Sequence, residues 1–171
     1  PTGGLYEAGT TIQISATASQ YWHFVAWAGS VEGVLTPTNI TMSTNATIRA
    51  QFAETLQTNG TPQSWLAQYG LAINDAGALS DTDGDGLAAW QEYIAGTLPN
   101  LGSSVFGISG NWKSQNGRII SWPSVSGRVY SVYWASNLAS GVWSQLSGNA
   151  GGVYTDTVHE VENKGFYRIE V

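Results

Sequence analysis

The chain has 171 residues, a formal net charge of −6, no cysteine and only six lysine and arginine residues. Without a basic stripe to neutralise phosphates, nucleic-acid binding is not expected, and without cysteine no disulfide can staple small domains. No apolar run approaches the roughly 20 residues that a helix needs to span a bilayer. Charged residues make up 11% of the chain, and such a charge-poor surface, rich in Thr and Asn, is commoner outside cells than inside.

The chain begins Pro1-Thr2-Gly3, with neither an initiator methionine nor a signal peptide. We interpret this start as that of a processed product or of a fragment.

Residues 1–54 predict a small β module. Thr11–Ala16 alternates apolar and polar positions, which is typical of a half-buried strand. His23–Trp27 and Ala46–Phe52 are two further strand candidates, separated by glycines and a proline. His23 has no Ser, Cys or Asp neighbour, and we expect it on the surface of its strand.

Within this segment, the runs "GGLYEAGTTIQISATASQYWHFVAWAG" and "NITMSTNATIRAQF" resemble the divergent internalin-type B repeat of bacterial surface proteins. The resemblance rests on Tyr6, Gly9, Phe24, Trp27, Gly29, Met42, Thr47 and Phe52. It implies a small β-grasp-like sheet that acts as a spacer or adhesion module without a catalytic role.

Residues 55–101 predict two short helices on either side of a loop. The first helix starts with Thr61 as N-cap and Pro62 at the first helical position, and Gly70 stops it. Apolar residues at helical spacing place a second helix from about residue 87 to Gly96.

The loop between these helices reads D-x-D-x-D-G-x5-E, the pattern of a twelve-residue calcium loop. The predicted ligands are the carboxylates of Asp81, Asp83, Asp85 and Glu92 and the backbone carbonyl of Leu87. Four carboxylates within twelve residues repel one another unless a cation is present. The sequence therefore predicts a calcium site.

The surrounding run "PQSWLAQYGLAINDAGALSDTDGDGLAAWQEYIAGTLPN" resembles the dockerin-like and thrombospondin-type-3-like calcium modules of bacterial extracellular proteins. The resemblance implies the same five ligands. However, the first helix ends well before the loop, and one loop is present where dockerins carry two, so neither cohesin docking nor calcium sensing is expected. Asn74 or Asp75 could add a ligand, which spacing alone leaves open.

Residues 102–171 predict a small antiparallel β-sandwich, because short strand candidates alternate with glycine-containing turns. The candidates are Val105–Ile108, Arg118–Trp122, Arg128–Trp134, Val142–Leu146, Gly152–Val158 and Gly165–Val171. We expect Trp122, Tyr130 and Trp143 in the core of this sandwich.

The last segment is similar to the C-terminal modules of secreted enzymes and large surface proteins of Verrucomicrobia-like bacteria. It has their isoleucine-rich strand ending in Trp122, then "G-x-x-Y-x-V", "N-L-x-x-G-x-W" and a closing "G-F-Y-R-I". The resemblance implies no defined activity. Because aromatic faces stack on sugar rings, Trp112 and Tyr133 are the candidate glycan-binding residues.

The sequence contains no catalytic constellation: no G-x-S-x-G motif, no histidine pair for zinc, and no paired carboxylates outside the predicted calcium loop. We therefore expect a mainly β chain of three modules, 1–54, 55–101 and 102–171, that is not an enzyme. The interpretation that fits best is a calcium-stabilised accessory, adhesion or spacer region of a secreted or cell-surface bacterial protein. Its expected partners are calcium and either an extracellular glycan or neighbouring copies of a surface protein.

Two alternatives remain at this point. One is a structural subunit of an extracellular filament or sheath, which would polymerise through strand edges and which size-exclusion chromatography with light scattering would detect. The other is the carbohydrate-binding tail of a secreted polysaccharide-degrading enzyme, which a glycan array would test.

Overall fold

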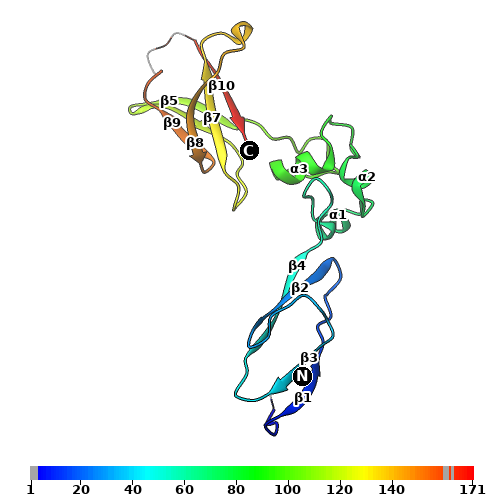
Figure 1. The fold of residues 1–171 in the computed structure, drawn as a ribbon. Helices are drawn as coiled ribbons and strands as arrows, with labels where there is room; N and C mark the ends of the chain where they lie inside the picture. Colours follow the sequence, from blue (N-terminus) through cyan, green and yellow to red (C-terminus); the bar gives the residue numbers. More distant parts are fainter. Residues whose placement is uncertain (1–3, 160–161, 163) are drawn as a thin grey trace. The chain divides into compact units, whose positions relative to one another are not determined.

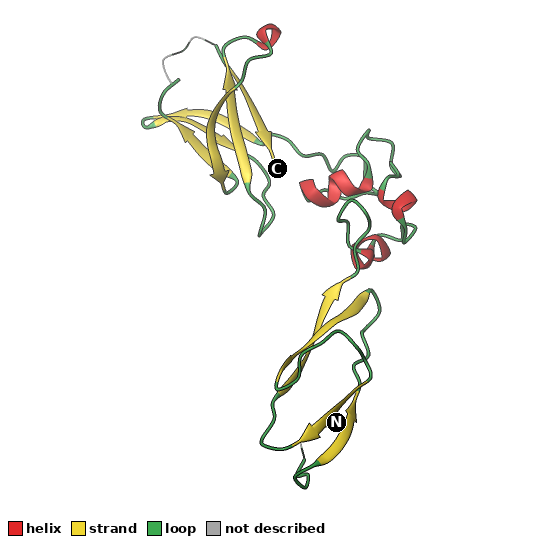
Figure 2. Ribbon diagram, viewed as in Figure 1, coloured by secondary structure: helices red, strands yellow, loops and turns green. Residues whose placement is uncertain are grey.

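The structure is a computed structural model that describes residues 4–159, 162 and 164–171 (Figures 1 and 2). It is mainly β, with small antiparallel sheets and a few short helices, which confirms the predicted fold class. The chain divides into two compact units, Pro1–Ala78 and Leu79–Val171. This division falls inside the segment predicted as the middle module.

The first unit begins with two antiparallel ladders of two strands each (Figure 1). One ladder pairs β1 (Thr10–Ile14) with β3 (Thr38–Met42), and the other pairs β2 (Trp22–Gly29) with β4 (Ile48–Glu54). The strands of the expected grasp-like sheet are thus arranged as two separate ladders. The strand β3 was not predicted from the sequence, although its Ile40 and Met42 alternate with polar residues as Ile12 and Ile14 do in β1.

Aromatic side chains form the packed part of this unit. The ring centroids of Phe24 lie 5.2 Å from Trp27 and 6.0 Å from Phe52. Trp27 is buried, and its indole N–H donates a 2.9 Å hydrogen bond to the carbonyl of Leu35, which satisfies the polar tip of an otherwise apolar ring. His23 lies exposed on β2, as predicted.

The helix α1 (Gln63–Gln68) lies where the sequence predicted it, but its N-terminus is built differently. Pro62 holds the N-cap position and no side chain caps the helix, so the capping role predicted for Thr61 is wrong. The hydroxyl and the N–H of Thr61 instead donate to Asn59 Oδ1, at 2.8 and 3.1 Å. The Thr61 side chain therefore forms a hydrogen bond within a local turn instead of capping the helix.

A short helix that the sequence did not predict, α2 (Asp75–Ala78), closes the first unit. The side chain of Asn74 accepts a 2.9 Å hydrogen bond from the N–H of Gly77. Asp75 accepts hydrogen bonds from the N–H and the hydroxyl of Thr58, at 2.9 and 2.7 Å. Both side chains thus hold the turn into this helix.

The second unit begins with the acidic loop and helix α3 (Ala89–Ala95). The helix ends at Gly96 as predicted, with Gly96 in the left-handed conformation at φ 79°. A Cβ at Gly96 would also run into the side chain of Val125. Nearby, Arg128 donates a 3.0 Å hydrogen bond to the carbonyl of Tyr93 and places its guanidinium over the Tyr93 ring. These contacts attach α3 to the turn that precedes β7.

Two three-stranded antiparallel sheets form the rest of the second unit (Figure 2). One sheet has the order β5 (Gly110–Ser114), β6 (Gly117–Ser121), β9 (Val153–Asp156). The other has the order β10 (Phe166–Glu170), β7 (Tyr130–Ala135), β8 (Ser144–Ala150), and a 3-10 turn, η1 (Leu138–Ser140), precedes β8. Buried side chains of both sheets and their connections form one core: Ile120, Trp122, Tyr130, Val132 and Ala150.

The core of this sandwich differs from expectation in two places. Trp122 and Tyr130 are buried as predicted, but Trp143 is only half buried: its ring packs against the side chain of Arg168, which is itself 42% exposed, and not in the core cluster. The predicted strand Val105–Ile108 is wrong: this segment has no strand pairing, and Phe106 instead stacks on the Tyr130 ring at 6.0 Å.

A buried carboxylate ties β9 to the chain end. Asp156 is 0% exposed, and it accepts hydrogen bonds from the Tyr167 hydroxyl at 2.7 Å and from the N–H groups of Val158 and His159 at 2.9 and 3.1 Å. The ring nitrogen Nδ1 of His159 lies 2.9 Å from the carboxylate, and the same ring stacks on Trp134. Burial and the hydrogen bond of the Tyr167 hydroxyl to Asp156 raise the pKa of Tyr167 above its ordinary value.

Candidate metal centre

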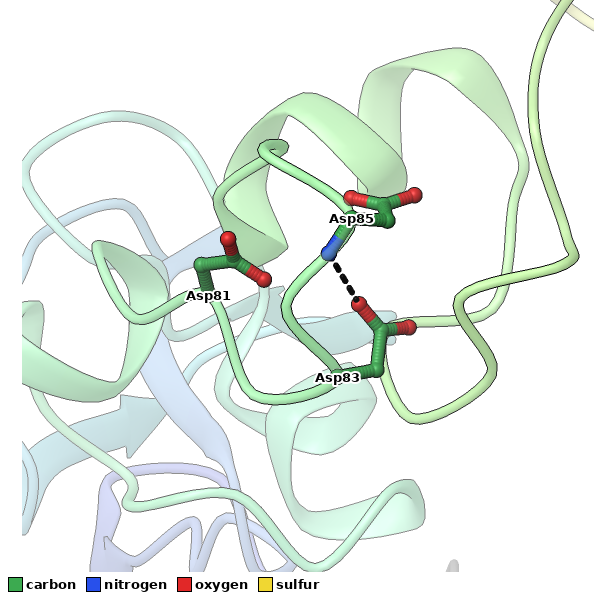
Figure 3. A group of neighbouring side chains, drawn as sticks. All are labelled: Asp81, Asp83 and Asp85. Atoms are coloured by element: carbon green, nitrogen blue, oxygen red, sulfur yellow. Dashed lines mark hydrogen bonds between the residues drawn. The ribbon is translucent and has the colours of Figure 1, made fainter.

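The loop before α3 gathers three carboxylates at one place. Ligand atoms of Asp81, Asp83 and Asp85 all lie within 4.8 Å of one another (Figure 3). These are the three aspartates that the spacing pattern named. At such distances the negative charges repel one another unless something positive lies among them.

Hydrogen bonds from the loop's own backbone determine how these carboxylates are held. Asp81 accepts from the N–H of Gly84 at 2.8 Å and from the N–H of Gly86 at 3.0 Å. Both glycines have positive φ values, 80° and 96°, a conformation that side chains with a Cβ rarely adopt. The pattern glycine at the sixth position therefore lets the chain fold back over the first aspartate.

The second and third aspartates each use one oxygen to shape the loop. Asp83 Oδ1 accepts from the N–H of Asp85 at 3.3 Å (Figure 3), and Asp85 Oδ1 accepts from the N–H of Leu87 at 2.8 Å. The Oδ2 atoms of both aspartates are buried and have no hydrogen-bond partner among the described residues. A buried charged oxygen without a partner is costly, so this geometry favours a bound cation.

The fourth predicted carboxylate lies on the first turns of α3. Glu92 is 0% exposed; its Oε1 accepts a 3.2 Å hydrogen bond from the Thr97 hydroxyl, and its Oε2 is buried without a partner among the described residues. Burial raises the pKa of Glu92, the Thr97 hydrogen bond opposes that effect, and the charges of Asp83, Asp85 and Asp81 raise the pKa further. Glu92 is thus outside the 4.8 Å group but within electrostatic reach of all three aspartates.

The segment after α3 belongs to this centre, which the spacing pattern did not reveal. A Cβ built on Gly102 would lie 3.5 Å from the carbonyl oxygen of Asp83 and 3.7 Å from Cβ of Asp85. The backbone at Gly102 therefore passes directly beside the loop. The same segment carries Thr97, whose hydroxyl contacts Glu92. The one sequence signal for this contact was a hydroxyl residue five positions after the last predicted ligand, and such residues are too common to single out Thr97.

The two residues left open as additional ligands are engaged elsewhere in the described structure. The side-chain oxygen of Asn74 accepts from Gly77, and both oxygens of Asp75 accept from Thr58. The hydroxyl and the N–H of Thr58 lower the pKa of Asp75. Neither residue belongs to the group of aspartates that the structure brings together.

The donor set of the centre consists of oxygen atoms only. Carboxylate oxygens, supplemented by backbone carbonyls, are the ligands that hard divalent cations such as calcium and magnesium take in proteins. Such a cation would satisfy Asp83 Oδ2, Asp85 Oδ2 and Glu92 Oε2, the three carboxylate oxygens for which the described part of the chain offers no hydrogen-bond partner. The residues present therefore fit a hard cation.

The two candidate glycan-binding aromatics have different surroundings. Trp112 lies on the edge strand β5, is 48% exposed, and packs one side of its ring over Gly110. Tyr133 is half buried, and the guanidinium of Arg168 lies 4.9 Å from its ring centroid. The Tyr133 ring is thus already covered by a cation, and Trp112 is the more accessible of the two.

Comparison with known proteins identifies the first segment. Residues 1–56 match the family described as the divergent InlB B-repeat domain, which confirms the predicted internalin-type B repeat there. The match covers about a third of the chain. No curated protein and no solved structure matches the chain. A B-repeat domain is compatible with a surface accessory region.

Of the helices in the described part of the chain, none is long and apolar enough to cross a membrane.

Proposed function

We propose that this chain is a non-catalytic, calcium-stabilised accessory region of a secreted or cell-surface bacterial protein, acting as a spacer or adhesion segment. The observation that carries the proposal is the set of three buried carboxylate oxygens, on Asp83, Asp85 and Glu92, that have no hydrogen-bond partner within the described structure. The B-repeat match of residues 1–56 supports the surface-protein context.

Calcium fits this centre better than magnesium for two reasons. The loop has the twelve-residue spacing of calcium loops, with a glutamate at its last position. Magnesium also keeps several of its own waters, whereas the free oxygens of this centre are buried by the surrounding chain. An ion that sheds most of its water therefore suits the site.

The proposed role of the ion is to stabilise rather than to switch. Extracellular calcium modules have dissociation constants of roughly 10⁻⁴–10⁻³ M, so a site of this kind is mostly filled at millimolar calcium. A tenfold excess over the dissociation constant stabilises the folded state by about 1.4 kcal/mol. For a loop with a small core of its own, this contribution decides whether the segment stays closed.

The same proposal assigns no catalysis to the chain. The carboxylates that the described structure gathers into one group are those of the acidic loop, and the proposal commits them to the ion. Turnover of a polysaccharide, ester or peptide that a point substitution within the chain abolishes would contradict this part of the proposal.

Titration calorimetry on the metal-free chain tests the calcium proposal. We expect one calcium site with a dissociation constant of roughly 10⁻⁴–10⁻³ M, weaker binding of magnesium, and a calcium-dependent rise of the melting temperature. Chelation with EDTA should increase proteolysis between Leu71 and Ala95 and leave residues 1–54 intact. The absence of calcium heat at millimolar ion, together with melting indifferent to EDTA, would overturn the site.

A second candidate function, weak glycan contact, is favoured by the exposed ring of Trp112 on the edge strand β5. Trp112→Ala should weaken any glycan binding by about threefold to tenfold, because an aromatic contact contributes about 0.5–1.5 kcal/mol beyond its area. Tyr133→Ala is the matched control and should change binding little, since Arg168 already covers that ring. Equal affinities of the wild type and Trp112→Ala in calorimetry with a hit from a glycan array would remove this candidate.

A further inference from the structure

We propose that Thr97 is a positioning residue of the metal centre: its hydroxyl holds one oxygen of the Glu92 carboxylate and leaves the other for the ion. The inference rests on the proposed calcium site, since it concerns how that site presents its last ligand. It goes beyond the spacing pattern, which ends at Glu92.

Two hydrogen bonds join the same pair of residues. The Thr97 hydroxyl donates to Glu92 Oε1 at 3.2 Å, and the Thr97 N–H donates to the backbone carbonyl of Glu92 at 3.1 Å. Thr97 is 9% exposed and Glu92 0% exposed, so water does not compete freely for either bond. The Glu92 backbone thus anchors Thr97, and the Thr97 hydroxyl in turn holds the Glu92 side chain.

The end of α3 brings Thr97 into this position. Gly96 takes the left-handed conformation, and its N–H donates to the Glu92 carbonyl at 2.7 Å. This turn reverses the chain at the end of the helix, so the next residue lies back over the turn that carries Glu92. The segment then continues beside the loop at Gly102, close to Asp83 and Asp85.

The consequence concerns calcium affinity. A glutamate side chain has several rotatable bonds, and a free one loses that freedom when it binds an ion. Because Thr97 already restricts the Glu92 carboxylate, less freedom remains to be lost on binding. Residues that orient metal ligands in this way typically change metal affinity by about 10- to 100-fold when they are removed.

The test compares variants that differ in the hydroxyl alone. Calcium calorimetry on the full 171-residue chain should give Thr97→Val a dissociation constant about tenfold or more above the wild-type value. Thr97→Ser, which keeps the hydroxyl, should restore it to within about threefold of wild type, which a purely packing role of the threonine methyl group would not predict. Thr97→Ala, which removes the hydroxyl but keeps the backbone hydrogen bond, provides the same readout if valine does not fit.

Thr44→Val is the matched control, because Thr44 is an exposed loop residue in the other compact unit; its calcium affinity should equal that of the wild type. Wild-type affinity in both Thr97→Val and Thr97→Ala would overturn the role of Thr97 and leave the calcium site standing. A wild-type chain that binds no calcium would instead overturn the proposed function itself.

Discussion

Replacing Glu92 by glutamine should make the chain more stable in calcium-free buffer and abolish its stabilisation by calcium. Glu92 is fully buried, its Oε2 has no hydrogen-bond partner among the described residues, and both burial and three neighbouring aspartates raise its pKa. Glutamine keeps the shape and the acceptor for Thr97 but removes the buried charge. Relief of this buried charge, and of its repulsion by the three aspartates, is on the order of 1–3 kcal/mol.

Calcium should reduce the stability difference between the two proteins. A tenfold excess of calcium over the dissociation constant adds about 1.4 kcal/mol to the wild type, and a hundredfold excess adds about 2.7 kcal/mol. Calcium should stabilise Glu92→Gln much less than the wild type, because the last ligand of the loop no longer carries a negative charge. Urea unfolding at zero and several millimolar calcium measures both effects.

Glu7→Gln is the control for this experiment, because Glu7 is an exposed glutamate in the other compact unit and should respond to calcium as the wild type does. If Glu92→Gln gained as much stability from calcium as the wild type, Glu92 would not be a ligand. If Glu92→Gln were less stable than the wild type without calcium, the Glu92 carboxylate would be stabilised in the wild type by a group that the structure does not show.

Replacing Asp156 by asparagine should destabilise the sandwich by about 3 kcal/mol, the cost typical of breaking a buried, charged hydrogen-bond network. Asp156 is fully buried and accepts hydrogen bonds from Tyr167, Val158 and His159. An asparagine has one acceptor oxygen where the carboxylate has two, and it carries no charge. Thermal or urea unfolding of the full chain at pH 7 measures the difference.

The pH dependence of this effect has a definite sign. Burial by itself raises the pKa of Asp156, but the hydrogen bonds from Tyr167, His159 and Val158 outweigh burial and place the pKa below its ordinary value. A depressed pKa in the folded state contributes stability that is fully present above the unfolded value of about 3.9 and is lost as the pH falls through the folded value. The difference in free energy of unfolding between the wild type and Asp156→Asn should therefore decrease in strong acid.

Glu170→Gln is the control for Asp156, because Glu170 forms a surface ion pair with Arg168, with both side chains largely exposed. Such pairs contribute roughly 0–1 kcal/mol, so this substitution should have a small effect. A change at Asp156 no larger than that at Glu170, or a stability difference between wild type and Asp156→Asn that does not shrink as the pH falls below about 3.9, would contradict the role of the buried network.

The sequence by itself determined the features that depend on neighbouring residues. The spacing of Asp81, Asp83 and Asp85 named the three carboxylates that the structure gathers, because all three lie in one short loop whose glycines allow the turn. Gly96 ended α3 where predicted, since a helix terminus is a local property. Alternation of apolar residues likewise located most strands of the sandwich, because each such strand buries one face.

Only the tertiary structure decided the features that depend on distant partners. The strand β5 exists because β6 pairs with it, although its own residues show little apolar alternation. Val105–Ile108 is apolar enough for a strand but finds no partner backbone, and Phe106 enters the core instead. The hydrogen bond of Thr97 to Glu92 and the network around Asp156 join residues whose types are common. No local pattern names such pairs: they lie only 2 to 11 residues apart, but the folded path of the backbone decides whether their atoms come within hydrogen-bonding distance.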